Sequence, residues 1–258
     1  MNEMKRYAIF YTPPPGGFAD AAAAWLGWDA QVGQVAVQPA IAGLPRPMAD
    51  LTAAPRRYGF HGTIKPPFRL AAGVSAGDLA AAVQALAGQY RPVALPGLQM
   101  VDLEGFLAFV PDGDASGLAG LAAEVVRVLD PYRAALTEAE TARRHPDRLT
   151  PRQRDLLAIY GYPYVMEEFR FHLTLSGPLA AAEHPTVAKA AATHFAGRVP
   201  QPFQLTDLSL MDEDAAGCFH LLHRYPLGAW SAASSRAMPT CGVESLAMSM
   251  TGSPSGSA

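Results

Sequence analysis

The stretch "FHGTIKPP" at residues 60–67 recurs later in the chain as "FHLTLSGP" at residues 171–178. Both copies read Phe-His-x-Thr followed by an aliphatic residue. After each copy comes a segment with the pattern of a helix, and then a pair of strand-like segments. Repetition of this kind is typical of an internally duplicated fold. The sequence therefore predicts a duplicated α+β structure of two related lobes, in which strand–helix–strand–strand occurs twice.

The other elements follow from hydrophobic periodicity and from the positions of Pro and Gly. The predicted strands lie at 6–14, 56–70, 93–111 (a pair), 164–179 and 203–227 (a pair). The predicted helices lie at 18–29, 75–89, 116–136 and 184–196. Ser75 is expected to cap the second of these helices, and the third is expected to bend at Pro131. The charged segment 137–160 is expected to form one or two exposed helical pieces.

Length and composition set the scale of the fold. The chain has 258 residues, half of them hydrophobic, which is enough for one large domain or two closely packed lobes. We expect residues 1–230 to form a single bilobal domain. From Ser231 onward the sequence is rich in Ser, Gly, Ala and Met, so a disordered tail is expected at 231–258.

The charge balance argues against a long nucleic-acid partner, because the formal net charge is −3 and such partners require a broad basic face. A small phosphorylated substrate held by a few local charges remains compatible with it. No apolar run approaches the ~20 residues that span a bilayer, and the N-terminal segment lacks the apolar core of a signal peptide. Cys218 and Cys241 form no disulfide framework or metal-binding spacing. We therefore expect a cytoplasmic monomer without membrane contact.

The repeated motif places polar side chains in pairs. Residues i and i+2 of a strand project to the same face, so His61 accompanies Thr63 and His172 accompanies Thr174. Two related lobes that face each other would bring both pairs to one groove. There one imidazole can be neutral and act as base while the other is protonated and acts as acid. With two threonine hydroxyls as donors to phosphoryl oxygens, this set supports in-line attack on phosphorus without a metal or cofactor.

Two His-x-Thr motifs on equivalent strands of a duplicated α+β fold resemble those of the 2H phosphoesterase superfamily, which includes the RNA-ligase-like cyclic phosphodiesterases. "YGFHGTIKPPF" (58–68) together with "FRFHLTLSGPL" (169–179) is similar to a bacterial branch of phosphonate metabolism proteins. The likeness extends over roughly 5–228 in architecture and is close only at 60–66 and 171–177. It implies two antiparallel sheets that face a central groove, with helices outside. It also implies metal-independent hydrolysis of a cyclic phosphodiester of a small ribose- or nucleotide-type substrate.

The resemblance assigns catalytic roles to four residues, namely His61, His172, Thr63 and Thr174. One histidine would take a proton from the attacking water, and the other would protonate the departing oxygen. The threonines would hold the non-bridging oxygens as charge develops on them. Which histidine is the base stays open at this point.

Strand parity adds candidates for substrate binding, which are Lys65, Arg170, Tyr11, Ser176 and Arg57. If the strands are regular, Arg57, Gly59 and Lys65 share the face of His61, and Arg170 and Ser176 share that of His172. Gly59 would leave room for substrate because it has no side chain. Each charged candidate can equally be a solvated strand end or a salt-bridge partner, and Tyr11 can equally be a core residue.

Other functions are compatible with parts of this pattern. The motifs would also suit an RNA-end-processing or ligase-like activity, or a non-catalytic nucleotide- or phosphate-binding protein. A metal-dependent hydrolase lacks a convincing ligand cluster, since His220 and His223 point to opposite faces of a strand. The five arginines between 143 and 154 form either a solvated face or a lid or substrate-binding insertion between the lobes.

Overall fold

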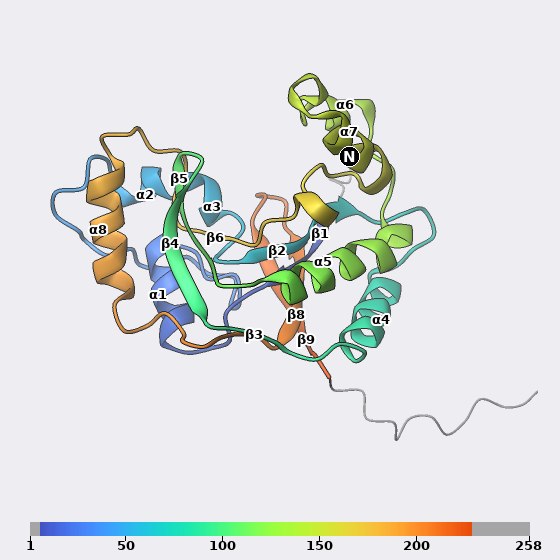
Figure 1. The fold of residues 1–258 in the computed structure, drawn as a ribbon, viewed down its shortest axis with the longest axis horizontal. Coiled ribbons are helices and arrows are strands. Elements are labelled where there is room, and N and C mark those ends of the chain that lie inside the picture. Colours follow the sequence, from blue (N-terminus) through green and yellow to red (C-terminus); the bar gives the residue numbers. More distant parts are fainter. Residues whose placement is uncertain (1–5, 229–258) are drawn as a thin grey trace, which may run out of the picture.

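A computed structural model describes residues 6–228, and a seven-stranded antiparallel sheet forms its centre (Figure 1). The order across this sheet is β4-β5-β6-β2-β1-β8-β9. In that order the strands are Gly97–Leu103, Phe106–Asp112, Leu173–Thr174, Gly62–Arg69, Arg6–Tyr11, Asp207–Glu213 and Phe219–Pro226. Two further strands, β3 (Val93–Leu95) and β7 (Phe203–Leu205), pair with each other. The expected tail at 231–258 and Cys241 lie outside the described residues.

The duplication predicted from the repeated motif is confirmed by the order of the elements. The first copy runs β2, α4 (Ala76–Ala87), β3, β4 and β5, and the second runs β6, α8 (His184–Phe195), β7, β8 and β9. The α+β class and the antiparallel pairing are as expected. The two halves are not separate sheets, however, because β2 and β6 pair through Gly62 and Leu173. One hydrogen-bonded sheet therefore carries both motifs.

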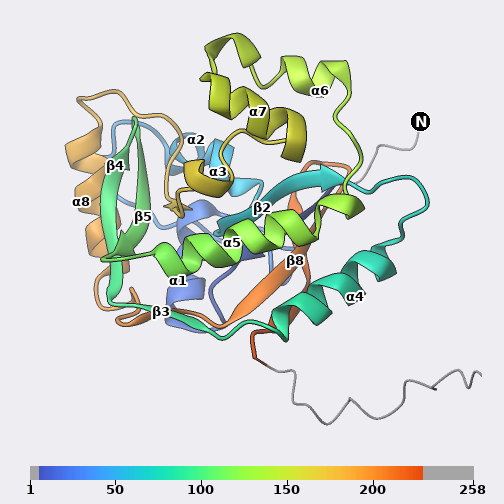
Figure 2. The same ribbon diagram turned by 45° about the vertical axis from the view of Figure 1, so that its right-hand side comes forward.

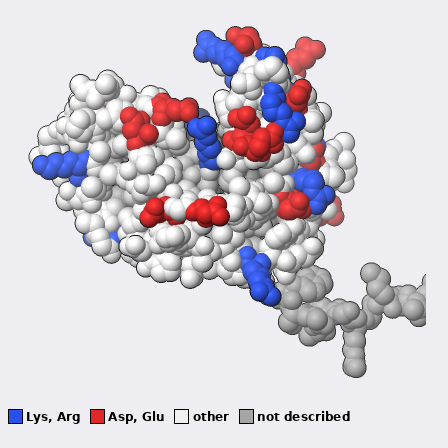
Figure 3. All heavy atoms as spheres, viewed as in Figure 1, with Lys and Arg blue, Asp and Glu red and all other residues white. Residues whose placement is uncertain are grey.

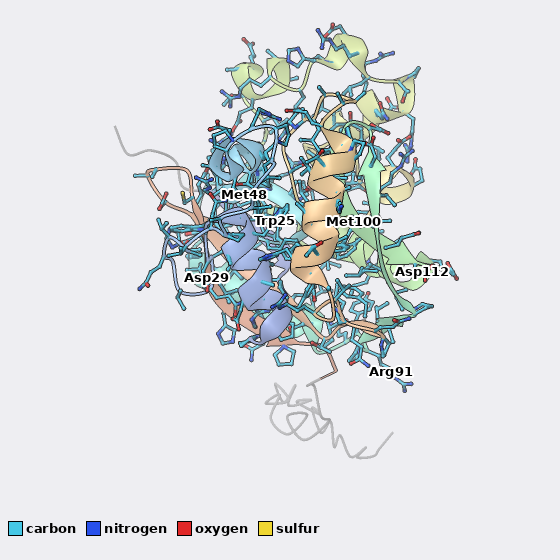
Figure 4. All side chains as sticks on the ribbon, turned by 90° about the vertical axis from the view of Figure 1, so that its left-hand side faces the viewer. Trp25, Asp29, Met48, Arg91, Met100 and Asp112 are labelled. Carbon is cyan, nitrogen blue, oxygen red and sulfur yellow. The ribbon has the colours of Figure 1, made fainter. Side chains whose placement is uncertain are left out.

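Helices cover the sheet from several sides (Figure 2). Helix α5 (Ser116–Val128) packs across β2, and α4 packs against β8 and β9. Helices α1 (Gly17–Leu26) and α8 contact each other. Trp25 of α1 is buried between them and stacks near Phe195, with ring centroids 5.8 Å apart (Figure 4). Its indole Nε1 donates a hydrogen bond to the carbonyl of Leu175, which ties α1 to the second motif.

Local capping explains where several helices begin. Ser75 accepts a hydrogen bond from the backbone N–H of Asp78, and the Asp78 carboxylate accepts one from Ser75 N–H. This reciprocal pair satisfies two amides that have no partner within the helix. The predicted N-cap of α4 is therefore confirmed. Helix α5 ends at Val128, and a 3₁₀ turn at Asp130–Tyr132 follows it, where Pro131 lacks the N–H that a longer helix would need.

The strands that carry the motifs are shorter than predicted. The irregular connection before them contains two short helices, α2 (Met48–Leu51) and α3 (Ala53–Arg56). Gly59 follows with a φ of 69°, a left-handed conformation that breaks a strand. A Cβ at Gly59 would lie 2.6 Å from Ala30 Cβ. Gly59 thus serves a tight turn against Ala30, and the expectation that it leaves room for substrate is wrong.

The charged segment forms a helical insertion that protrudes from the sheet (Figures 1 and 2). It comprises α6 (Glu138–Ala142), a 3₁₀ turn at Pro146–Arg148, and α7 (Pro151–Tyr160). Side chains of both charge signs gather on it, whereas most of the remaining face in this view is uncharged (Figure 3). The prediction of exposed helical pieces in this segment is confirmed. None of the described helices is long and apolar enough to cross a membrane.

Candidate active site

The two His-x-Thr motifs are direct neighbours in the sheet. Their middle residues, Gly62 and Leu173, form the register pair between β2 and β6. In an antiparallel pair, opposite residues point to the same face, and the positions on either side point to the other face. The four outer residues of the motifs therefore share one face: His61, Thr63, His172 and Thr174. The sequence-based expectation that both pairs meet is fulfilled within one sheet.

Gly62 is required at this junction by its packing. A Cβ added there would lie 2.3 and 2.4 Å from two ring atoms of Phe171 and 3.2 Å from a methyl of Leu173. Real side chains never approach so closely, so only glycine lets the second motif come this near. The difference between the motifs, Gly in one and Leu in the other, thus follows from their mutual contact.

Both histidines are oriented in the same way by their own backbone. His61 Nδ1 lies 2.9 Å from the carbonyl oxygen of Gly59, and His172 Nδ1 lies 2.8 Å from that of Arg170. A carbonyl can only accept, so each Nδ1 carries a hydrogen and donates it. In the neutral ring, Nε2 is then the unprotonated nitrogen. The two imidazoles are therefore held in equivalent tautomers with Nε2 available for proton transfer.

His61 lies among aromatic rings. Its ring centroid is 4.0 Å from that of Phe10 and 5.5 Å from that of Tyr58, both in stacked arrangements. Burial by these neighbours lowers the pKa of His61 to about 4; the hydrogen bond to Gly59 opposes the shift, and the charge of His172 adds to it. At neutral pH His61 is consequently uncharged and able to accept a proton.

A pocket of about 340 Å³ opens over this face. Three of the four motif residues line it, namely His61, Thr63 and Thr174. His172 lies beside the pocket, with its ring 5.8 Å from that of Phe106, which is part of the lining. Ser176 also lines it, and its buried Oγ accepts a hydrogen bond of 3.0 Å from Leu107 N. Ser176 is thus the predicted substrate-binding residue that the structure brings to the motif residues.

Lys65 does not share the face of His61, which corrects the parity prediction. The pairing of β1 and β2 shifts register between Phe10–Thr63 and Ile9–Lys65, and such a bulge re-aims the side chains after it. Lys65 is 2% exposed. Its Nζ donates to the carbonyl of Val126 at 3.2 Å and lies 3.6 Å from the Asp130 carboxylate. Lys65 thus faces α5 and is absent from the lining of the motif pocket.

Three other predicted residues also lie away from the motif pocket. Arg170 is exposed and pairs with Glu104 at 3.2 Å. Arg57 is exposed at the end of α3, outside any strand, which removes the parity argument for it. Tyr11 is buried in the core, with its ring 5.0 Å from that of Phe203. The core reading of Tyr11 is therefore the correct one.

The structure adds lining residues that strand parity could not identify. They are Arg6, Tyr58, Phe106, Arg144 and Tyr162. Arg144 and Tyr162 come from the helical insertion and its exit, and the Arg144 guanidinium lies 4.9 Å from the centre of the Tyr162 ring. The five arginines of the insertion were the only sequence signal for Arg144. Among residues 6–228, no three His, Cys, Asp or Glu side chains gather as a metal-binding group.

Two curated proteins share substantial sequence with this chain. The ribose 1,5-bisphosphate phosphokinase PhnN of Janthinobacterium sp. (strain Marseille) is 37% identical over 222 residues, covering 84% of this chain and 49% of that protein. Its namesake in Laribacter hongkongensis (strain HLHK9) is 36% identical over 220 residues, covering 85% of this chain and 51% of that protein. The chain thus spans about half the length of the curated relatives it matches.

Solved structures align over most of the chain at low identity. The crystal structure of E. coli LigT complexed with 3′-AMP is 18% identical, covers 87% of this chain and 99% of that chain, and has a TM-score of 0.37. For TT0787 of Thermus thermophilus the corresponding values are 16%, 86%, 98% and 0.38.

A family match covers more than half of the chain. Residues 63–220 match the family described as "Protein of unknown function (DUF1045)". The matched region begins at Thr63 and includes His172 and Thr174, so it contains the second motif and the threonine of the first. The chain belongs to the DUF1045 family.

Proposed function

We propose that this protein is a phosphoesterase that hydrolyses a small cyclic phosphodiester by two-histidine acid–base catalysis. The observation that carries the proposal is the register pair Gly62–Leu173, because it sets both His-x-Thr motifs on one face beside one pocket. The matched orientation of the two imidazoles by backbone carbonyls supports it further. Two proton-transfer groups and two hydroxyl donors are what in-line displacement at phosphorus requires.

In this proposal His61 is the base for ring opening. Its lowered pKa keeps Nε2 unprotonated at neutral pH, so it can accept a proton from water as the water oxygen bonds to phosphorus. The bond from phosphorus to one ring oxygen breaks, and protonated His172 delivers its Nε2 proton to that oxygen. One water is consumed, and the product is a phosphate monoester with a free hydroxyl. Histidine protonation is restored by transfer to and from solvent.

The threonine hydroxyls take the role of anion stabilisers. Thr63 and Thr174 both line the pocket, one from each motif, so they approach the phosphorus from two sides. Their hydroxyls donate to the non-bridging oxygens, on which negative charge increases in the transition state. Fixed donors of this kind are worth roughly 10²–10³ in rate each when they act on a developing oxyanion.

The names of the curated relatives support a ribose-type substrate, and we place the activity in phosphonate metabolism on those names and on the motif resemblance. A kinase activity of the P-loop type has no motif in this chain. Its three lysines, Lys5, Lys65 and Lys189, follow Met, Ile and Ala, so the Gly-Lys pair that cradles phosphates in P-loop kinases is missing. The phosphoesterase reading therefore rests on this chain's own motifs.

The test is hydrolysis of nucleoside 2′,3′-cyclic phosphates and ribose 1,2-cyclic phosphate in the presence of EDTA. We expect turnover of at least one compound, and a loss of about 10²–10⁴ in kcat for His61→Ala and for His172→Ala. His223→Ala, an exposed histidine on β9, is the matched control and should keep full activity. Full activity in either motif variant, or no turnover of any compound, would refute the proposal.

A further inference from the structure

A second pocket adjoins the motif pocket. It has a volume of about 510 Å³ and lies between β2 and the segment that runs from Arg133 to Gly161. The two pockets share four lining residues: Arg6, Pro66, Pro67 and Arg144. A molecule seated over the His-x-Thr motifs can therefore extend past these residues into the second pocket without crossing the protein.

The second pocket is lined by cationic side chains. They are Arg6, Lys65, Arg69, Arg133, Arg143 and Arg144, and Glu140 is the acidic residue among the lining. Lys65, which the motif pocket lacks, lies in this lining instead. Arginine is suited to phosphate because its planar fork donates two hydrogen bonds at once.

Ion pairs account for part of this charge. Glu140 binds Arg69 at 2.7 Å, and Asp130 contacts both Arg133 at 2.9 Å and Lys65 at 3.6 Å. Glu213 pairs with Arg6 through both nitrogens of the fork. These three carboxylates thus accompany four of the six cations. Burial lowers the pKa of Lys65 to about 8, with Asp130 opposing the shift, so the ammonium is still largely charged at neutral pH.

Arg143 and Arg144 are not explained by structural ion pairing. Neither has a carboxylate within 4.0 Å among the described residues. Arg69 and Arg133 hold the insertion in place, through Glu140 and through a hydrogen bond of 2.9 Å to the carbonyl of Ile159. The insertion therefore sits over the pocket with two arginines whose charge is unmatched locally.

We propose that this pocket binds a second phosphate group of the same substrate while the cyclic phosphodiester lies over the two histidines. The inference rests on the proposed function and narrows it. The preferred substrate is a small cyclic phosphodiester that also carries a phosphate monoester. Arg144, at the boundary, contacts the region between the two groups, and Arg143 acts on the monoester alone. The helical insertion is then a specificity element.

Equilibrium binding tests the second subsite without requiring catalysis. We expect adenosine 3′,5′-bisphosphate to bind at least about tenfold more tightly than 3′-AMP, a difference of roughly 1.4 kcal/mol. In the Arg143→Gln/Arg144→Gln double variant this advantage should disappear, and Arg143→Lys should retain part of it. Arg148→Gln removes the same charge from the same insertion but lies outside both linings, so it should keep the advantage.

Equal binding of the two nucleotides by the native protein, or an equal loss in Arg148→Gln, would overturn the second subsite. Turnover separates this inference from the proposed function. If cyclic phosphates are hydrolysed at the same kcat/KM with and without a 5′-phosphate, the phosphoesterase stands and the subsite is wrong. If the bisphosphate binds preferentially but no cyclic phosphate is hydrolysed, the subsite stands and the proposed function is wrong.

Discussion

Gly62 and Leu173 face each other across the junction of β2 and β6, and each is the middle residue of a His-x-Thr motif. A local twofold axis through this pair would exchange His61 with His172. The two histidines are then diagonal neighbours on one face, and such positions are roughly 7–8 Å apart in antiparallel pairs. This spacing leaves room for one tetrahedral phosphate between the two imidazoles, which is the geometry that the proposed reaction needs.

Replacing Gly62 with Ala should separate the two motifs. The new methyl group would collide with the Phe171 ring, for which the closest approach is 2.3 Å. We expect a loss of about 1–3 kcal/mol in the free energy of unfolding, measured by urea denaturation, together with reduced turnover. Gly120→Ala is the control, because nothing lies within 4 Å of its Cβ in α5. That change should leave stability unchanged or raise it by up to about 1 kcal/mol.

The titration of His61 should lie far below that of an ordinary histidine. Burial lowers its pKa to about 4, so NMR should show the His61 ring neutral at pH 6, and the acid limb of kcat/KM should rise through about pH 4. Tyr58→Ala removes a stacked ring and should move that limb to higher pH. An acid limb near pH 6.5 in the native protein would contradict the assignment of His61 as the buried base.

The same shift links stability to pH. The folded-state pKa of His61 lies below the usual 6.5, so between about pH 6.5 and pH 4 the unfolded chain binds this proton and the folded chain does not. The free energy of unfolding should therefore fall as pH drops through this window. Denaturant titrations of the native protein and His61→Gln should show that the variant lacks this part of the pH dependence. Parallel curves for the two proteins would exclude it.

Removal of the motif hydroxyls should affect the rate more than the fold. Thr63→Val and Thr174→Val keep the side-chain shape but lose the donor to the phosphoryl oxygen. We expect kcat to fall by roughly 10²–10³ in each variant, with little change in the urea midpoint. Thr193→Val, on the exposed side of α8, should retain normal kcat. Unchanged kcat in both motif variants would remove the threonines from the mechanism.

The buried pair of Lys65 and Asp130 allows a double-mutant cycle. Asp130→Asn leaves the Lys65 ammonium 2% exposed and without the carboxylate that lies 3.6 Å away, so stability should fall by about 1–3 kcal/mol at neutral pH. Lys65→Met/Asp130→Asn should recover part of this loss, because the buried charge is then absent. Additive effects of the two changes, measured by thermal and urea unfolding, would show that the pair is uncoupled.

Sequence patterns predicted the elements whose signals are local. Ser75 and Asp78 form their capping pair within four residues, and the motif repeat is visible without any knowledge of packing. Lys65 could not be placed, because the bulge that turns it away arises from pairing with β1, which is distant in sequence. Arg144 reaches the pocket only because the insertion folds back over the sheet, and neither periodicity nor parity encodes that return.

The interleaving of the two repeats has a consequence for their origin. The β4–β5 hairpin of the first repeat pairs with β6 of the second, and the β8–β9 hairpin of the second pairs with β1, which borders β2 of the first. A single repeat folded alone would thus leave its motif strand without a flanking hairpin. The arrangement implies an ancestral dimer of one-repeat chains that exchanged hairpins before gene fusion, in which each subunit supplied one histidine to a shared site.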